Sequence, residues 1–231
     1  MTKGLPLTPG PRHPTPALPD PSRVLILKPS SLGDIIHALP FLHLLRVRFP
    51  KAHLSWLVKS EWSPLLQGHP ELDEVISVRF RFGEVGALLR AVRRDFDWVI
   101  DLQGLLRTGL LARLSGAPVR IGLSDAREGA GVFYTHRAPI PGEPLHAVER
   151  YLLAARFFDR PSPERQFVLP DLTDADRTLE NVIQSKKIPV DRPWIAVHST
   201  ARQTPKRWPA QRFCAVADRL ISERRAALLF I

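Results

Sequence analysis

The sequence predicts an α/β protein built on parallel sheets, and three observations carry this prediction. Short apolar segments alternate along the chain with longer segments of helical periodicity. The segments Val24–Leu27 and Trp98–Ile100 are apolar at successive positions, which is typical of strands buried on both faces. Polar loops that contain glycine follow several of these segments. We therefore expect helices on both faces of the sheet and a ligand site at the carboxyl ends of its strands.

The expected elements begin after a proline-rich leader, residues 1–22. This stretch holds seven prolines and no continuous apolar core, so we expect disorder rather than a secretory signal. The first domain is expected at 23–160. Within it we expect strands at 23–28, 52–58, 73–78, 97–101 and 119–122, and helices at 35–49, 84–94, 105–114 and 146–158.

Prolines 161, 163 and 170 mark the boundary to a linker and second domain at 161–231. Two strands that end at the last residue offer little apolar surface for a sheet of their own, so we expect the second domain to be incomplete. Its expected elements are a helix at 173–187, a strand at 194–198, a helix at 209–224 and a strand at 226–231.

The composition limits the classes of binding partner but does not select one of them. The chain carries 33 basic and 23 acidic residues, a formal net charge of +10. This excess favours nucleic acid, phosphorylated sugars or an anionic membrane face. No apolar run approaches the roughly 20 residues of a membrane span, and one cysteine cannot form an internal disulfide. We expect a cytoplasmic protein.

The loop from Lys28 to Asp34 is the first candidate site. It joins the first strand to the first helix, whose N-terminus offers free backbone N–H groups. Gly33 allows a ligand to approach the backbone closely. Asp34 either caps the helix or accepts a proton from a bound hydroxyl, and the residues alone favour capping. The loop lacks the spacing of a dinucleotide or P-loop site.

Two further loops of the first domain carry candidate ligand groups. Asp101 follows the fourth strand and either faces the same crevice or caps the next helix. Gln103 and Arg107 are candidates for binding sugar hydroxyls or an acidic group. Arg127 is suited to a carboxylate or phosphate, and the alternative is a surface ion pair with Glu128 or Asp125, which stabilises little by itself.

A basic and aromatic segment, Arg79 to Phe82, precedes a helix with further arginines. Such interleaving suits a nucleic-acid platform or a membrane-facing patch. A solvated helix face accounts for the helical arginines as well.

The loop from His198 to Pro209 is the candidate site of the second domain. It concentrates hydroxyls and cations directly before a helix, which suits a diphosphate. Two Asp-x-Asp triplets lie at a strand start and a helix start, so we assign no metal. The loop's hydroxyls and cations are Ser199, Thr200, Thr204, Arg202, Lys206 and Arg207.

Several segments together resemble a known family. They are SSLGDIIHALP at 30–40, DLQGLLRT at 101–108, AREGA at 126–130, FYTHR at 133–137, HAVER at 146–150 and KRWP at 206–209. In combination they resemble glycosyltransferase family 9, the ADP-heptose:lipopolysaccharide heptosyltransferases, and most nearly the heptosyltransferase I branch.

The resemblance implies a GT-B fold, in which the first Rossmann-like domain binds the acceptor and the second binds the nucleotide sugar. It implies an inverting, metal-independent transfer of heptose from ADP-heptose to the Kdo (3-deoxy-octulosonate) of a lipid A precursor, with no cofactor. The implied location is the cytoplasmic face of the inner membrane, in peripheral contact with its anionic surface and without a nucleic-acid partner.

By resemblance, Asp34 is the general base and Lys206 stabilises the departing diphosphate. The remaining implied contacts are Ser199, Thr200 and Arg202 for the donor, and Ser31, Gly33, Gln103, Arg107 and Arg127 for the acceptor.

Two features depart from the family pattern. The spacer between Arg202 and Lys206 is longer, and the later nucleotide-holding segments are absent, so we expect little turnover by this chain itself. Two alternatives stay open: a non-catalytic basic module that binds anionic glycolipid or nucleic acid, and a family 9 transferase with another sugar nucleotide.

Overall fold

The computed structural model describes residues 18–80, 83, 85–158, 165–201 and 204–230. Most of the expected leader and Arg202 therefore lie outside the described residues. The chain divides into two compact units, Met1–Asp171 and Leu172–Ile231, which we call unit 1 and unit 2. The last leader residues are held by unit 1, because Asp20 pairs with Arg48 at 2.9 Å.

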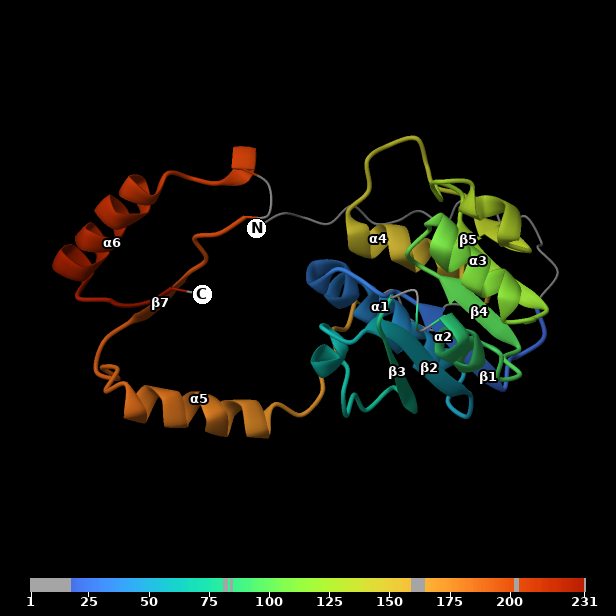
Figure 1. The fold of residues 1–231 in the computed structure, drawn as a ribbon, viewed down its shortest axis with the longest axis horizontal. Coiled ribbons are helices and arrows are strands. Elements are labelled where there is room, and N and C mark those ends of the chain that lie inside the picture. Colours follow the sequence, from blue (N-terminus) through green and yellow to red (C-terminus); the bar gives the residue numbers. More distant parts are fainter. Residues whose placement is uncertain (1–17, 81–82, 84, 159–164, 202–203, 231) are drawn as a thin grey trace. The chain divides into compact units, whose positions relative to one another are not determined.

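Unit 1 is built on a parallel sheet of six strands. They are β1 (Arg23–Leu27), β2 (His53–Lys59), β3 (Glu74–Val78), β4 (Trp98–Asp101), β5 (Val119–Leu123) and β6 (His136–Ala138). Their order across the sheet is β3-β2-β1-β4-β5-β6, and every neighbouring pair is parallel (Figure 1). The chain thus leaves β1 in one direction along the sheet and returns to the other side of β1 at β4. The α/β class and the Rossmann-like first domain are confirmed.

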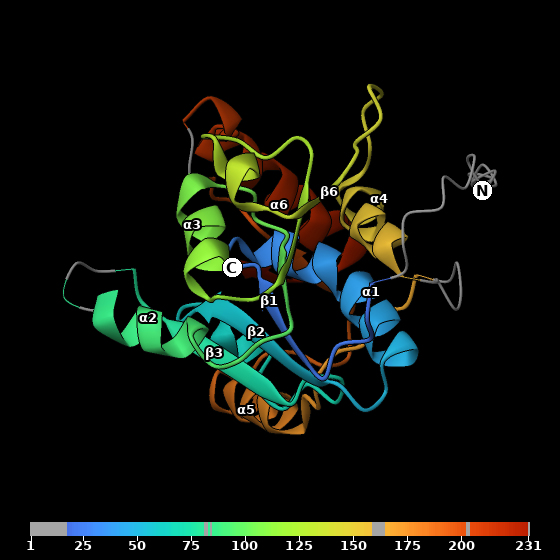
Figure 2. The ribbon, with the colours of Figure 1, turned by 90° about the vertical axis from the view of Figure 1, so that its right-hand side faces the viewer.

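Helices cover both faces of this sheet, as the apolar strands predict. The main helices of unit 1 are α1 (Leu32–Arg48), α2 (Val85–Val92), α3 (Leu106–Leu114) and α4 (Ala147–Leu152). Val24 and Ile26 of β1 pack in one core cluster with α1 and α4, whereas Leu25 and Leu27 pack in another with α2 and α3. Figure 2 shows α1 and α4 apart from α2 and α3 on opposite sides of the strands. Both faces of β1 are therefore buried against apolar side chains.

Helix α1 begins at Leu32, three residues before the predicted start at 35. Ser31 has extended backbone angles and stands at the N-cap, and its backbone N–H donates to Asp34 Oδ2 at 3.2 Å. This satisfies one donor at the helix start and places the acidic side chain in the positive first turn. The predicted start is wrong because apolar periodicity begins later than the backbone helix.

Strand β6 is a second difference from the sequence-based expectation. It has only three residues, one buried, and pairs with β5. A segment this short carries no periodicity, so only pairing to an existing strand defines it. The helix expected at 146–158 is α4 followed by a tighter helical segment, Leu153–Phe157.

The described residues of unit 2 form two α-helices, one short 3₁₀ helix and a two-stranded parallel sheet. Its elements are α5 (Thr173–Ser185), β7 (Trp194–Val197), α6 (Ala210–Arg224) and β8 (Ala227–Phe230). Among its described residues, Ala217 and Ala226 alone are buried. This unit matches the expected start of a second parallel domain. Across both units, the described helices include none with the length and apolarity that crossing a bilayer requires.

Candidate functional site

Polar side chains from four segments meet at the carboxyl edge of the unit 1 sheet. They enclose a cavity of about 270 Å³, which we call the polar pocket. Parallel strands end at one edge, so loops far apart in sequence converge there. The pocket is lined by Lys28, Asp34, Gln103, Asp125, Arg127, Arg150 and Tyr151.

Asp34 is the carboxylate most suited to accept a proton. Its side chain is 41% exposed, so a ligand can reach it. Its Oδ1 accepts a hydrogen bond from the Tyr151 hydroxyl at 3.3 Å, and its Oδ2 lies 3.8 Å from Lys28 Nζ. Burial alone would raise the pKa of Asp34, but Lys28, Ser31 and Tyr151 together outweigh burial and lower this pKa below its ordinary value. Asp34 is therefore ionised at neutral pH.

Both interpretations of Asp34 are consistent with this geometry. Oδ2 contacts the N-cap residue Ser31, as capping requires, while Oδ1 is shared with Tyr151 at the pocket. The cap holds the side chain in place, and the second oxygen remains beside the cavity. The same carboxylate can thus cap the start of α1 and accept a proton from a ligand.

Lys28 is a buried cation, and the sequence patterns alone predict no role for it. Lys28 is 2% exposed. Its ammonium group donates a hydrogen bond to Gln103 Oε1 at 3.3 Å and lies 5.1 Å from the centre of the Tyr151 ring. Burial lowers the pKa of Lys28 to about 8, although Asp34 acts in the opposite direction. A lysine directly after a buried strand is the signal that identifies it.

Arg150 and Tyr151 bring helix α4 into the pocket, and the sequence analysis assigned neither. Arg150 binds both oxygens of Asp125, at 2.7 and 2.8 Å. This bidentate pair fixes the Arg150 guanidinium in the lining of the polar pocket, to which Arg127 of the loop after β5 also belongs. The HAVER segment at 146–150 contains Arg150 but gives no indication that the helix faces the loop after β5, because that proximity is tertiary.

Asp101 holds the loop after β4 rather than lining the pocket. It is fully buried and accepts hydrogen bonds from the backbone N–H groups of Gln103 and Gly104, at 2.8 and 3.0 Å, and from the Tyr134 hydroxyl at 2.7 Å. Burial raises the pKa of Asp101, and these donors oppose that rise. Asp101 therefore positions the turn that carries Gln103 into the pocket.

The predicted acceptor residues fall in different places. Gln103 and Arg127 line the polar pocket, and Ser31 is bonded to Asp34. Gly33 is exposed in the first turn of α1, with nothing within 4 Å of a Cβ placed there. Arg107 lies elsewhere: its guanidinium stacks over the Phe80 ring at 4.1 Å and lines other cavities.

Unit 2 carries its candidate residues on the loop between β7 and α6. Ser199 and Thr200 follow β7, and Lys206 ends the short helix Thr204–Lys206 and is exposed. Arg207 Nε donates a hydrogen bond to Ala201 O at 2.7 Å, which links two parts of this loop. Within the described ranges, His, Cys, Asp and Glu side chains form no group of three or more that suits a metal ion.

Comparisons with known proteins define the class of fold first. The chain aligns with an E. coli heptosyltransferase WaaC solved with ADP-2-deoxy-2-fluoro heptose at a TM-score of 0.68 and 30% identity, over 89% of this chain and 68% of that one. A family 9 glycosyltransferase from Veillonella parvula aligns at a TM-score of 0.78 and 22% identity, over 90% and 62%, which bears on the fold alone. The two parallel α/β units are those of a GT-B type glycosyltransferase.

The sequence model of glycosyltransferase family 9 (heptosyltransferase) matches residues 85–231, more than half of the chain. The chain belongs to this family. Lipopolysaccharide heptosyltransferase 1 of Pseudomonas aeruginosa is 36% identical over 159 residues, 62% of this chain and 44% of that protein. The E. coli K12 enzyme of the same name is 32% identical over 207 residues, 82% of this chain and 61% of that protein. The chain thus spans less than two thirds of either relative.

Proposed function

We propose that the full-length protein transfers heptose from ADP-heptose to the Kdo of a lipopolysaccharide inner-core precursor, with inversion at the anomeric carbon and without a metal ion. The observation that carries the proposal is an ionised, accessible carboxylate, Asp34, in a pocket that contains three cations and one further carboxylate, Asp125. Family membership supports the reaction class.

In the proposed step, Asp34 Oδ1 accepts the proton of the acceptor hydroxyl as the hydroxyl oxygen attacks the anomeric carbon. The new C–O bond forms on one face while the bond to the diphosphate breaks on the other, so configuration inverts in a single displacement. Lys28 keeps Asp34 ionised, and Tyr151 fixes the direction of its oxygen.

The donor side of the proposal rests on unit 2. The diphosphate leaves as an anion, and the exposed Lys206 ammonium neutralises its growing charge. Ser199 and Thr200 donate hydroxyl hydrogen bonds to its oxygens. ADP suits the donor because related E. coli structures hold ADP and an ADP-heptose analogue.

The acceptor side of the proposal rests on charge. A Kdo residue carries a carboxylate, and the pocket offers the guanidinium groups of Arg127 and Arg150 as well as the Lys28 ammonium. Planar guanidinium groups bind carboxylates through two parallel hydrogen bonds. Because Arg150 is already paired with Asp125, Arg127 is the group we assign to the acceptor carboxylate.

We also propose peripheral contact with the anionic inner face of the membrane, where a lipid-linked acceptor resides. For the 231-residue chain by itself we expect slow turnover, because unit 2 buries few side chains and so holds its donor loop weakly.

Replacing Asp34 tests the proposal. Asp34→Asn keeps the shape but cannot accept a proton, so we expect kcat for heptose transfer by the full-length protein to fall by about 10²–10⁴-fold. ADP-heptose affinity, measured by calorimetry, should stay within about twofold because the proposed donor contacts lie in unit 2. Asp174→Asn on α5, a side chain 96% exposed, is the matched control and should transfer normally. Transfer that survives Asp34→Asn contradicts the role of Asp34 as the base. Wild-type transfer from a different sugar nucleotide contradicts the assignment of ADP-heptose as the donor.

A further inference from the structure

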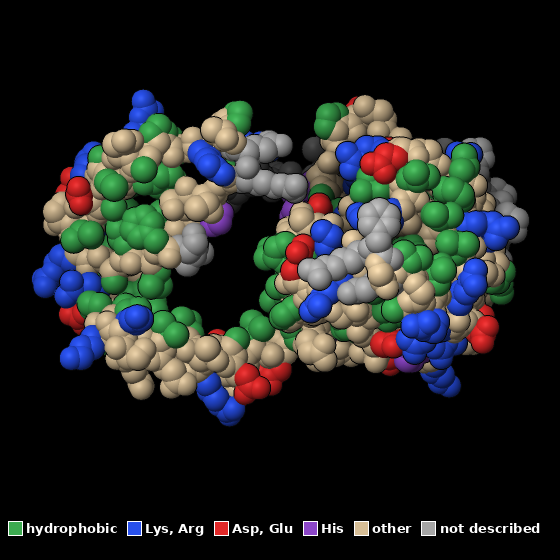
Figure 3. All heavy atoms as spheres, viewed as in Figure 1, with side chains coloured by type: hydrophobic (Ala, Val, Ile, Leu, Met, Phe, Trp, Pro, Cys, Tyr) green, Lys and Arg blue, Asp and Glu red, His purple; other side chains and the backbone are tan. Residues whose placement is uncertain are grey.

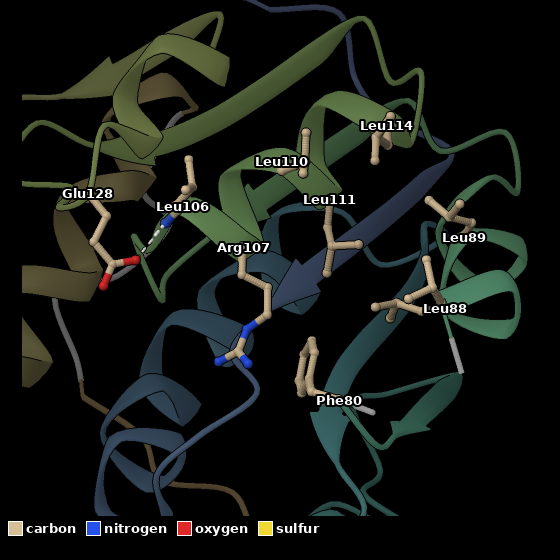
Figure 4. A pocket seen from close by; sticks show the side chains of 10 residues that line it. Phe80, Leu88, Leu89, Leu106, Arg107, Leu110, Leu111, Leu114 and Glu128 are labelled. Carbon is tan, nitrogen blue, oxygen red and sulfur yellow. Dashed lines mark hydrogen bonds between the residues drawn. The ribbon is translucent and has the colours of Figure 1, made fainter. Parts of the chain in front are cut away.

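A second cavity of unit 1 is apolar and opens between α2 and α3. Its volume is about 460 Å³, and Figure 4 shows Leu88 and Leu89 facing Leu111 and Leu114 across it. We call it the α2–α3 groove. Three of its apolar side chains are strongly exposed: Val85 at 50%, Leu106 at 47% and Leu110 at 42%.

This exposure distinguishes the groove from ordinary packing between two helices. Helices that pack bury their facing apolar side chains, and isolated exposed leucines are common on any surface. Here the exposed side chains belong to one concave lining, the kind of surface that marks a binding site.

A cationic pocket adjoins one end of the groove. It has a volume of about 340 Å³ and contains the side chains of Lys59, Arg79 and Arg107. Phe80 and Arg107 line both cavities, so the two are adjacent. Figure 4 shows Arg107 beside the Phe80 ring at this end of the groove. One carboxylate, Glu61, lies 3.4 Å from Lys59, which leaves an excess of positive charge.

The cationic pocket lies at the same edge of the sheet as Asp34. Lys59 ends β2, the neighbour of β1, and its backbone N–H donates to Pro29 O at 3.1 Å, one residue beyond Lys28. Three features therefore follow one another along unit 1: the polar pocket, a cationic pocket and an apolar groove. A lipid that carries a sugar, an anionic group and a hydrocarbon chain matches them in charge and polarity.

We propose that the α2–α3 groove binds a hydrocarbon chain of the lipid that carries the acceptor sugar, while Lys59, Arg79 and Arg107 bind a phosphate group of the same lipid. This inference rests on the proposed function, since it assigns the lipid end of the acceptor whose sugar reacts at Asp34. The Phe80 ring orients Arg107 at the junction, where a lipid changes from polar to apolar.

The first experiment compares an acylated Kdo-lipid A acceptor with the same acceptor after complete deacylation, using the full-length protein. Leu110→Gln places an amide in the groove at an exposed position that tolerates it. We expect KM for the acylated acceptor to rise roughly tenfold, with kcat unchanged and KM for the deacylated acceptor unaltered. Val132→Gln, at a side chain 80% exposed and outside the groove lining, should change neither KM.

The outcomes separate the two proposals. Wild-type transfer to neither acceptor defeats the proposed function itself. If the wild type transfers to both acceptors and Leu110→Gln changes neither KM, or changes both equally, the groove assignment is overturned. The proposed function is unaffected by that result. A change of oligomeric mass in Leu110→Gln, measured by light scattering, identifies a protein interface instead and also overturns the groove assignment.

The second experiment addresses the anionic group. Arg107→Gln should raise KM roughly tenfold for phosphorylated acceptors, with or without acyl chains. An acceptor stripped of its phosphates should show the same KM with wild type and variant. An equal effect on all acceptors would mean that Arg107 only supports α3, and would overturn its assignment to the phosphate.

Discussion

At the scale of single residues, the polar pocket depends on one buried ammonium. Lys28 is surrounded by Asp34, Gln103 and Tyr151, and it titrates with a pKa lowered by burial to about 8. Below that pH the cation helps to lower the pKa of Asp34 and, in the proposed reaction, attracts the anionic acceptor. Above it the pocket loses this charge, so we expect the proposed reaction to depend on pH in the alkaline range.

The alkaline pH dependence of transfer tests this role. We expect kcat/KM of the full-length protein to fall by about tenfold as pH rises through about 8, because neutral Lys28 no longer adds to the positive charge that attracts the acceptor anion to Arg127. Lys28→Met should show reduced activity at pH 7 and no further fall through this range. A flat wild-type profile between about pH 7 and 10 would contradict the charge role of Lys28.

The same lowered pKa affects stability with a definite sign. The unfolded chain holds the Lys28 proton up to about pH 10.4, whereas the folded protein releases it near 8. Between these values the unfolded state binds more protons, so the contribution of Lys28 to folding stability rises with pH. Activity and this contribution to stability therefore change in opposite directions.

At the scale of elements, β5 and the loop after it are joined by a close fit at Gly122. A Cβ at this position would overlap the Tyr134 ring, whose hydroxyl donates to the buried Asp101. The absence of a side chain on β5 thus allows Tyr134 to reach Asp101, and Asp101 in turn holds the turn with Gln103. A packing requirement in β5 thus helps to position Gln103, a pocket residue in the loop after β4.

Gly122→Ala tests this coupling. The added methyl must displace the Tyr134 ring, so we expect the free energy of unfolding to fall by about 1–3 kcal/mol. Gly86→Ala on α2 is the control, since its Cβ would meet only the flexible Arg90 side chain at 3.7 Å. That change should be neutral or stabilise by up to about 1 kcal/mol. Urea unfolding measures both, and equal stability of the two variants would contradict the coupling.

At the scale of the whole molecule, charge is the dominant property. The chain has a formal net charge of +10, and Figure 3 shows Lys and Arg side chains interspersed with hydrophobic ones on the face of unit 1 that it presents. We expect a surface of this kind to be attracted to anionic lipid headgroups through many weak contacts.

Vesicle binding tests the attraction to membranes. The full-length protein should sediment with phosphatidylglycerol vesicles at low ionic strength and dissociate as sodium chloride rises to about 0.5 M, because salt screens exposed charges. Phosphatidylcholine vesicles should bind little at any salt concentration. Equal binding to both lipids would contradict an electrostatic contact.

The amino-acid sequence by itself determined the α/β class, most strand positions and the loops that carry Asp34, Gln103 and Arg127. These features are local: successive apolar residues define a strand buried on both faces, and a polar loop after such a strand lies at the carboxyl edge. The combined motifs also identified the family, which the comparison with residues 85–231 confirmed.

Only the tertiary structure decided which of these residues meet. Strand β6 exists through its pairing with β5, and α4 brings Arg150 and Tyr151 to the pocket through contacts that no local pattern encodes. Arg107 belongs to the segment that also carries Gln103, yet it contacts Phe80 instead. The reason is geometric: local periodicity specifies an element and its buried face, whereas the neighbours of a side chain depend on how distant elements pack.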